Sequence, residues 1–574
     1  MIYSLRNFVP WCFLFFLPFV SPLAWSQNVD KDNQLRNLVN EYRQAEVTIP
    51  YPGLKQMDIL TRNVSISSVK DKTVHINISP LTIEWFISAK YDYSILKKAD
   101  IKGVISAGSV TQTMEWQSYP TYLQYDSIMR SFSQLYPAIC RLDTIGTSIN
   151  GKYIFALKIS DNAGLNEDEP EVFYSSTIHG DELAGYVLMM RLADYMLKNY
   201  SLNSRVKNMV DNLEIWINPL SNPDGTYGSG NSITSPVREN ANGIDLNRNF
   251  PEPPYTAYVA QKENIVMMKF LRKHRFVLSA NFHSGAEVVN YPWDKWYSIY
   301  HADNSWFNSI SRAYADTVHI YSGTGYMIDE INGVTRGAAW YIIHGGRQDF
   351  VTYELQGREV TIEIDAVKLT PGAQLELLWQ YNWRSFLGYL ENALNGIHGL
   401  VRDSQSAGPV PARILISGYD KDSSHIYSDT ISGRFIRMLT PGTWNLTFSA
   451  KGYRDTTIYN VLVLSGQKTD LTVEMQSLTT EIDTAKRNVP ILYPNPASDY
   501  LMAKLPENMD GRVNIIIISQ SGVKVADYYR DFLFGYPLEL DIRDLSGGGY
   551  TIIFTNTLSG VSYISRFIVS GRFF

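Results

Sequence analysis

The chain has 574 residues and a formal net charge of −6, and 19% of its residues are charged. This length predicts three or four domains. The weak acidity argues against a nucleic-acid partner, and no stretch after residue 26 approaches the roughly 20 apolar residues of a membrane-spanning helix. One of the two cysteines, Cys12, lies near the N-terminus, so Cys140 would have no partner for a disulfide once that end is removed.

Residues 1–26 have the pattern of a secretory signal peptide. Arg6 precedes an apolar run from Phe8 to Val20, and Ala24 and Ser26 lie at positions −3 and −1 of a cut before residue 27. Loss of Arg6 would change the formal charge from −6 to about −7. An exported protein without disulfides is typical of a bacterium.

Residues 27–113 combine a charged, helix-like start with alternating strands such as 73–78. This pattern predicts a small folded unit. It fits an N-terminal domain that is retained and a propeptide that is removed, and the residues do not decide between them.

A histidine and a carboxylate stand three residues apart between a predicted strand (171–178) and a predicted helix (183–197). At this spacing His179 and Glu182 can converge on one metal ion. Zinc hydrolases with two histidines and one glutamate need a further histidine from elsewhere, and the fourth position is left to water. His283, at the end of the apolar strand 276–282, is the candidate.

A third strand, 360–364, carries Glu363 inside an otherwise apolar run. A histidine at a strand end is often merely hydrogen-bonded, and a strand glutamate often faces solvent. Three such residues in this order make those interpretations weaker, since open α/β sheets place their sites at strand ends.

Five motifs resemble those of the zinc metallocarboxypeptidases. They are His179-Gly-Asp-Glu182, Asp245-Leu-Asn-Arg-Asn-Phe250, His283 with Asn290-Tyr-Pro-Trp-Asp294, Gly346-Arg-Gln-Asp349 and Glu359-Val-Thr-Ile-Glu363. The resemblance covers roughly residues 117 to 395. It is closer to the branch of carboxypeptidases N, E, M and D than to the pancreatic enzymes.

The resemblance implies a role for each matched residue. His179, Glu182 and His283 would hold one Zn²⁺ per chain, and Glu363 would be the general base. Arg238 would stabilise the developing oxyanion. Arg248, flanked by Asn247, would bind the terminal carboxylate of the substrate, and Tyr341 would close over the terminal residue.

Two further positions bear on specificity. Asp294 lies eleven residues after His283, and Gln348 lies fifteen before Glu363. In the N/E/M/D branch, residues so placed line the pocket for the C-terminal side chain and select lysine or arginine. A buried carboxylate there disfavours neutral side chains as well as attracting cations. The alternative is that Asp294 only caps a loop.

After residue 395 the pattern changes to short strands separated by turn signals. Residues 396–478 resemble the transthyretin-like domain that follows the catalytic domain in the same branch. A polar linker (479–490) leads to Tyr493-Pro-Asn-Pro-Ala497, which opens a segment (491–574) resembling the C-terminal sorting domain of type IX secretion substrates. The ending Ser570-Gly-Arg-Phe-Phe574 lacks the frequent lysine-rich tail, and a carbohydrate- or matrix-binding sandwich is the alternative.

The sequence therefore predicts an α/β catalytic domain (114–395), with a mixed sheet between helices, followed by two small all-β sandwiches. The expected protein is a secreted or surface-attached bacterial zinc carboxypeptidase that acts on peptide and protein C-termini and meets a secretion machinery through its C-terminal domain. The alternatives are the same chemistry on neutral or cell-wall peptides, and a zinc-free binding module.

Overall fold

The computed structural model describes residues 22–97, 101–255, 258–478 and 489–570. Of the signal peptide expected at 1–26, residues 1–21 lie outside the described residues. Among the described residues, no helix combines the length and the apolar character that crossing a membrane requires.

An eight-stranded mixed sheet forms the centre of the molecule, with strand order β11-β10-β12-β9-β7-β8-β6-β5. Its inner pairs β8-β7, β7-β9 and β9-β12 are parallel, and β12-β10, β8-β6 and β6-β5 are antiparallel. The strands are β5 (Cys140–Thr147), β6 (Tyr153–Ile159), β7 (Glu171–Ser176), β8 (Glu214–Asn218), β9 (Leu278–His283), β10 (Ala286–Tyr291), β11 (Val334–Arg336) and β12 (Arg358–Asp365).

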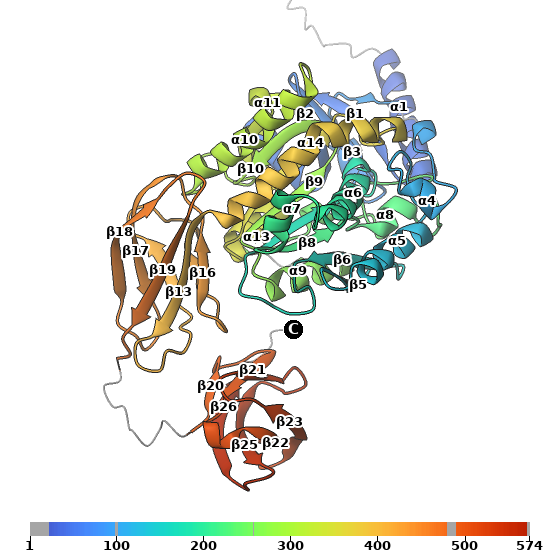
Figure 1. Cartoon of the computed structure of the whole chain (residues 1–574). Coiled ribbons are helices and arrows are strands. Elements are labelled where there is room, and N and C mark those ends of the chain that lie inside the picture. The colour runs from blue at the N-terminus through green and yellow to red at the C-terminus, as the bar shows by residue number, and fades with distance from the viewer. Residues whose placement is uncertain (1–21, 98–100, 256–257, 479–488, 571–574) are drawn as a thin grey trace, which may run out of the picture.

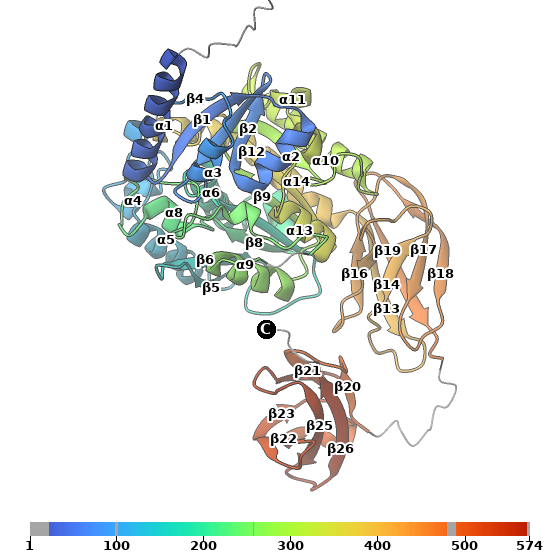
Figure 2. The same cartoon turned by 180° about the vertical axis from the view of Figure 1, so that it is seen from behind.

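Helices cover both faces of this sheet (Figures 1 and 2). One apolar core joins the sheet to helices α5, α6, α7, α10 and α14, and a second joins it to α9 and α13. Their bounds are α5 (Tyr122–Leu135), α6 (Ala184–Asn199), α7 (Ser204–Val210), α9 (Lys262–Lys273), α10 (Asn304–Ser322), α13 (Arg347–Glu354) and α14 (Leu375–Leu390). Because both faces are covered, β8, β9 and β12 are buried along their whole length. The predicted α/β class with a mixed sheet between helices is confirmed.

The N-terminal segment folds as a four-stranded sheet with order β2-β3-β1-β4 and three helices. Its elements are α1 (Pro22–Tyr42), β1 (Ala45–Pro50), α2 (Leu54–Asn63), β2 (Ser65–Lys70), β3 (Thr73–Ile78), α3 (Ile83–Ser88) and β4 (Ser94–Ile95). Its apolar core continues into the central unit through Trp340, Tyr341 and Ile343. The segment therefore packs directly on the central unit.

Two strand-rich units follow the central sheet, as the predicted all-β class requires. The first has sheets β16-β13-β19 and β15-β14-β17-β18 around one apolar core. Its strands are β13 (Gly396–Asp403), β14 (Arg413–Ile416), β15 (Ile426–Tyr427), β16 (Arg434–Arg437), β17 (Gly442–Ser449), β18 (Thr456–Val463) and β19 (Lys468–Met475).

The second strand-rich unit has sheets β20-β21-β24 and β23-β22-β25-β26, again around a single core. Its strands are β20 (Ile491–Tyr493), β21 (Tyr500–Lys504), β22 (Gly511–Ser519), β23 (Lys524–Phe532), β24 (Leu538–Asp541), β25 (Gly548–Asn556) and β26 (Ser562–Val569). Buried and partly buried residues alternate along β22 and β25, which gives each strand one face toward this core.

A buried ion-pair cluster joins the central unit to the first β unit. Both Arg358, at the start of β12, and Arg437, in β16, contact the carboxylate of Asp303, and all three side chains are almost fully buried. Removing one member of such a cluster leaves an uncompensated buried charge. Since β12 also carries Glu363, this cluster fixes one end of a strand that supplies the candidate site.

Candidate metal centre and active site

The candidate residues meet beyond the carboxyl ends of three neighbouring parallel strands. His179 and Glu182 lie in the turn between β7 and α6, His283 is the last residue of β9, and Glu363 pairs with His283 in the β9-β12 register. Parallel strands end at the same edge of a sheet, so the fold brings together residues that are distant in the sequence.

The turn after β7 is tightly packed. Thr177 adopts a positive φ of 57°, which is rare for a β-branched residue, and its hydroxyl donates to the Glu182 carbonyl at 3.0 Å. A Cβ atom at Gly180 would lie 2.2 Å from the Gly225 backbone. The glycine between His179 and Glu182 is therefore needed to seat the turn against α8 (Pro223–Tyr227).

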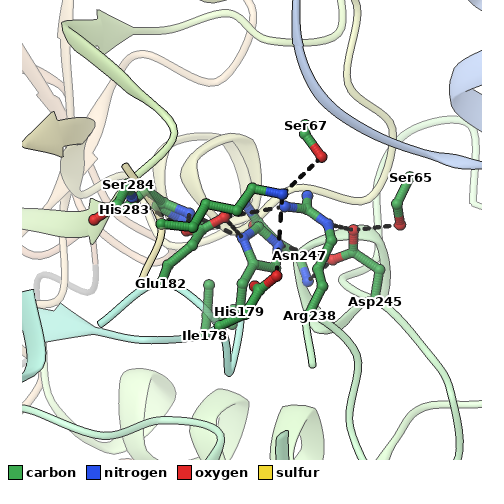
Figure 3. A network of polar contacts seen from close by, with 12 residues as sticks. Ser65, Ser67, Ile178, His179, Glu182, Arg238, Asp245, Asn247, His283 and Ser284 are labelled. Carbon is green, nitrogen blue, oxygen red and sulfur yellow. Dashed lines mark hydrogen bonds and ion pairs between the residues drawn. The ribbon is translucent and has the colours of Figure 1, made fainter. Parts of the chain in front are cut away.

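Three donor atoms face one another at this edge (Figure 3). The Nδ1 atoms of His179 and His283 are 3.1 Å apart, and the Glu182 carboxylate lies 2.8 Å from the first and 2.7 Å from the second. Donors around one tetrahedral zinc ion, each about 2.1 Å from it, are separated by about 3.4 Å. The separations of 2.7–3.1 Å found here are somewhat shorter than that. Two imidazoles and one carboxylate, all buried, fit a zinc ion in donor type and in their convergence on one point.

Outer partners hold the two imidazoles by their other nitrogen. His179 Nε2 lies 3.0 Å from Asp245 Oδ1, and His283 Nε2 lies 2.8 Å from the side-chain amide of Asn281. A proton on His179 Nε2 leaves Nδ1 as the free lone pair, as a metal ligand needs. Asp245 also accepts from Arg238 Nε at 3.0 Å.

The electrostatic environment suits these roles. Burial lowers the pKa of His283 to about 4, so its imidazole is neutral at pH 7. Burial would raise the pKa of Glu182, but the two adjacent histidines outweigh it and hold that pKa well below the ordinary value. Burial, reinforced by the charge of Glu182, raises the pKa of Glu363 well above that of an exposed glutamate. In the described part of the chain, Glu363 Oε2 has no hydrogen-bond partner.

A small cavity of about 20 Å³ lies beside the three donors. Seven of the residues proposed from the sequence line it: His179, Arg238, Asn247, Arg248, His283, Tyr341 and Glu363. Asn247 is anchored, because its Oδ1 accepts from the Arg347 backbone at 2.9 Å. The cavity thus combines two guanidinium groups with a carboxylate of raised pKa.

Asp294 and Gln348 do not line the cavity and lie behind Asn290, which does. Asp294 Oδ1 accepts from Asn290 Nδ2 and from Gln348 Nε2, each at 3.0 Å. Burial raises the pKa of Asp294 to about 6. No lysine or arginine of the described residues forms an ion pair with it within 4 Å. A Cβ atom at Gly337 would lie 1.8 Å from Asp294 Oδ1, so that position needs glycine.

The N-terminal segment enters this site, as Figure 3 shows for Ser65 and Ser67. The backbone carbonyl of Ile66 accepts from Arg238 Nη2 at 3.4 Å and from Arg248 Nη2 at 3.2 Å. The Ser65 hydroxyl donates to Asp245 Oδ2 at 2.7 Å, and Ser67 lines the cavity. A main-chain carbonyl of the N-terminal segment therefore accepts hydrogen bonds from both arginines.

Sequence reasoning missed three groups that shape this site. Asp245 opens the motif 245–250, but the motif alone does not indicate that Asp245 holds His179 and Arg238. Asn290 belonged to the motif that ends at Asp294, and again no role was assigned. The contact of Ile66 has no sequence signal, because it uses a backbone carbonyl brought from a separate sheet.

Comparison with known proteins gives two family matches. Residues 125–385 match the family described as zinc carboxypeptidase, and residues 491–570 match the secretion system C-terminal sorting domain. The carboxypeptidase N catalytic chain of Mus musculus is 31% identical over 380 residues, which is 58% of this chain and 82% of that protein.

Carboxypeptidase D of Homo sapiens is 35% identical over 353 residues, which is 59% of this chain and 25% of that protein, so the chain spans about a quarter of that relative. The crystal structure of carboxypeptidase A from Helicoverpa armigera superposes with a TM-score of 0.47 at 16% identity, covering 60% of this chain and 96% of that one. On the family match and the long alignment with carboxypeptidase N, the chain belongs to the zinc carboxypeptidases and carries a C-terminal sorting domain.

Proposed function

We propose that the protein is an active zinc carboxypeptidase that removes C-terminal residues, with a preference for lysine and arginine. The observation that carries this proposal is the convergence of two imidazole nitrogens and a carboxylate, 2.7–3.1 Å apart, beside a cavity with Arg238, Arg248 and Glu363. His179, Glu182 and His283 would hold the zinc ion. When bound, zinc would acidify the attacking water and polarise the scissile carbonyl.

The remaining residues take roles that their chemistry allows. Glu363, whose pKa is raised by burial, would accept a proton from the attacking water and return it to the leaving amine. Arg238, held in place by Asp245 and Glu182, would stabilise negative charge on the carbonyl oxygen. Arg248 would bind the terminal carboxylate of the substrate, with Asn247 beside it and Tyr341 closing over the terminal residue.

The preference for basic residues rests on Asp294 and Gln348, at positions that select lysine or arginine in the branch that this chain resembles. The carboxylate of Asp294 has amide donors but no cationic partner. A substrate side chain with a positive charge would supply that partner. The same fold acting on neutral or cell-wall peptides is the second candidate, and an inactive binding module is disfavoured because all three donors and Glu363 are present.

A panel of peptides that differ only in the last residue tests this function. We expect Lys- and Arg-ending peptides to be cleaved at least about tenfold more efficiently, by kcat/KM, than peptides ending in Leu, Ala or Glu. Chelation should abolish activity, and added Zn²⁺ should restore it. Amidation of the C-terminus should prevent cleavage, because the carboxylate that Arg248 binds is then absent. Efficient cleavage of amidated peptides would contradict the exopeptidase assignment.

We also propose that residues 27–113 act as a propeptide. The support is that Ile66 occupies both arginines, while Trp340, Tyr341 and Ile343 are buried against the segment. Two polar contacts fix it from the sides: Asn77 Nδ2 donates to Glu239 Oε1 at 2.7 Å, and Lys368 pairs with Glu46. A peptide C-terminus and this segment would compete for the same guanidinium groups.

Releasing the segment should activate the enzyme. With a specific protease site introduced at residues 97–102, we expect cleavage to raise kcat/KM by about tenfold or more, since the competent site becomes accessible in most molecules. The unmodified chain treated with the same protease is the control. Gel filtration verifies that the segment has dissociated, and unchanged activity after dissociation would contradict the proposal.

The expected signal peptide and the C-terminal sorting domain both bear on where the protein acts. The match to a secretion system C-terminal sorting domain, together with the signal expected at 1–26, supports export across the outer membrane of a bacterium. We propose that the protein acts outside the cell, either free or attached to the surface, and that its C-terminal unit contacts the secretion machinery.

A further inference from the structure

A second cluster of carboxylates lies in the loop between β6 and β7, before the strand that leads to His179. One carboxylate oxygen from each of Asp161, Glu167 and Glu169 can be chosen so that all three lie within 4.8 Å of one another. This span is about twice the length of a Ca²⁺–oxygen bond, so one ion could contact all three oxygens. The loop precedes the amino end of β7, whereas the zinc ligands follow its carboxyl end, so the two sites are separated by the length of that strand.

A fourth carboxylate lies next to the cluster, at the buried start of β8. Glu214 is fully buried, and its Oε1 accepts from the Glu167 backbone at 2.6 Å and pairs with Lys158 at 2.8 Å. Its Oε2 is buried and has no partner among the described residues. The same holds for Asp161 Oδ1 and Glu169 Oε2. Three carboxylate oxygens on three different residues therefore lack a donor.

The charges of this cluster do not balance. Among the ion pairs of the described residues, the four carboxylates (Asp161, Glu167, Glu169, Glu214) have one cationic partner, Lys158, which pairs with Glu214 and donates to the Leu165 carbonyl. Glu167 has neutral donors, the side chains of Ser160 and Asn162. Burial, followed by the charges of Glu167, Asp161 and Glu214, raises the pKa of Glu169 to about 8. Buried carboxylates without partners are costly, and a bound divalent cation is a common way to compensate them.

We propose that Asp161, Glu167, Glu169 and Glu214 form a binding site for a divalent cation, and that Ca²⁺ is the ion it prefers. Every available donor is an oxygen, whereas zinc favours nitrogen and sulfur. The acids come from one irregular loop and one strand end, which suits the flexible coordination of Ca²⁺ better than the strict octahedron of Mg²⁺.

Cation binding would stabilise the fold rather than take part in catalysis. The loop links the first β unit to the central unit: Asp168 pairs with Arg434 of β16 at 3.0 Å, and Glu171, two residues after Glu169, contacts His274 at the end of α9. A cation that holds the loop would also hold the start of β7 and its contact with the first β unit. This inference does not depend on the proposed peptidase activity.

The test is a thermal unfolding measurement on the whole chain, freed of divalent ions and returned to a fixed micromolar concentration of Zn²⁺. Addition of 2 mM Ca²⁺, an amount chosen as about a hundredfold above a Kd of about 20 µM, should raise Tm by about 3 °C or more. Mg²⁺ at the same concentration should raise it less. Calorimetric titration with Ca²⁺ should give one binding site.

Glu169→Gln and Glu167→Gln are the informative variants, and Asp168→Asn in the same loop is the matched control. Each glutamine variant should lose the Ca²⁺ response, yet its Tm without Ca²⁺ should equal or exceed that of the unmodified chain, because a repelling charge is removed. Asp168→Asn should keep the response. No Tm shift in the unmodified chain, a shift that persists in both glutamine variants, or an equal response to Mg²⁺ would overturn the proposal.

Discussion

Replacing Glu363 with glutamine should lower kcat by about 10²–10⁴-fold while zinc remains bound. Glutamine keeps the size and position of the side chain but cannot accept the proton of the attacking water. The three proposed metal donors are untouched, so the zinc content, measured by elemental analysis, should stay at one per chain. The measurement is steady-state kinetics on an Arg-ending peptide after the N-terminal segment has been released.

Glu287→Gln is the matched control for this variant. Glu287 lies on β10 beside Ile364 in the β10-β12 register, and its carboxylate accepts from the Met327 backbone, away from the cavity. We expect it to keep most of the activity. His179→Ala and His283→Ala should instead lose the metal. A Glu363→Gln enzyme with near-normal kcat would show that the base has been assigned wrongly.

Asp294→Ala should reduce kcat/KM for Lys- and Arg-ending peptides by at least about a hundredfold, which corresponds to about 3 kcal/mol for breaking a desolvated charge pair. Cleavage of Ala- or Leu-ending peptides should stay level or increase, because the unpaired carboxylate that disfavours them is gone. A general folding defect would lower both classes together. The ratio of kcat/KM for Lys- and Arg-ending peptides to kcat/KM for Ala- and Leu-ending peptides therefore distinguishes a loss of recognition from a loss of stability.

Two further measurements sharpen this prediction. Gln348→Ala should shift the ratio in the same direction but less, since an amide offers a hydrogen bond rather than a charge. Burial raises the pKa of Asp294 to about 6, so its carboxylate is protonated below that pH. The preference for Arg over Leu should then decline as the pH falls through about 6, and Asp294→Asn should show no such decline. An unchanged ratio in Asp294→Ala would place the selecting residue elsewhere.

The fold class could be predicted from the sequence, and candidate metal donors could be proposed from it, because both depend on local patterns. The strand before His179 and the helix after Glu182 are visible as apolar periodicity, and the structure has them as β7 and α6. His283 is a candidate from its place at the end of another apolar strand, and the family resemblance assigns it to the same metal ion. The structure places the donors within 3.1 Å of one another, a distance that no spacing along the chain could provide.

Other features depend on contacts between segments that are far apart, and these were not predictable. The residues of 27–113 left a retained domain and a propeptide equally open, because only the tertiary structure puts the Ile66 carbonyl on Arg238 and Arg248. Glu214 gave no signal either, since it joins Asp161, Glu167 and Glu169 only when β8 pairs beside β7. The position of Asp294 in the sequence suggests a role, but its amide partners, Asn290 and Gln348, follow from the packing around it.

The sequence by itself determined the chemistry that this protein carries: which residue types are present, in which order, and on which strands and helices. The tertiary structure alone decided what those residues face. Periodicity and motif spacing report on neighbours within a few residues, whereas the charge balance around a carboxylate or a guanidinium depends on groups that sheet pairing and domain packing bring within a few ångströms.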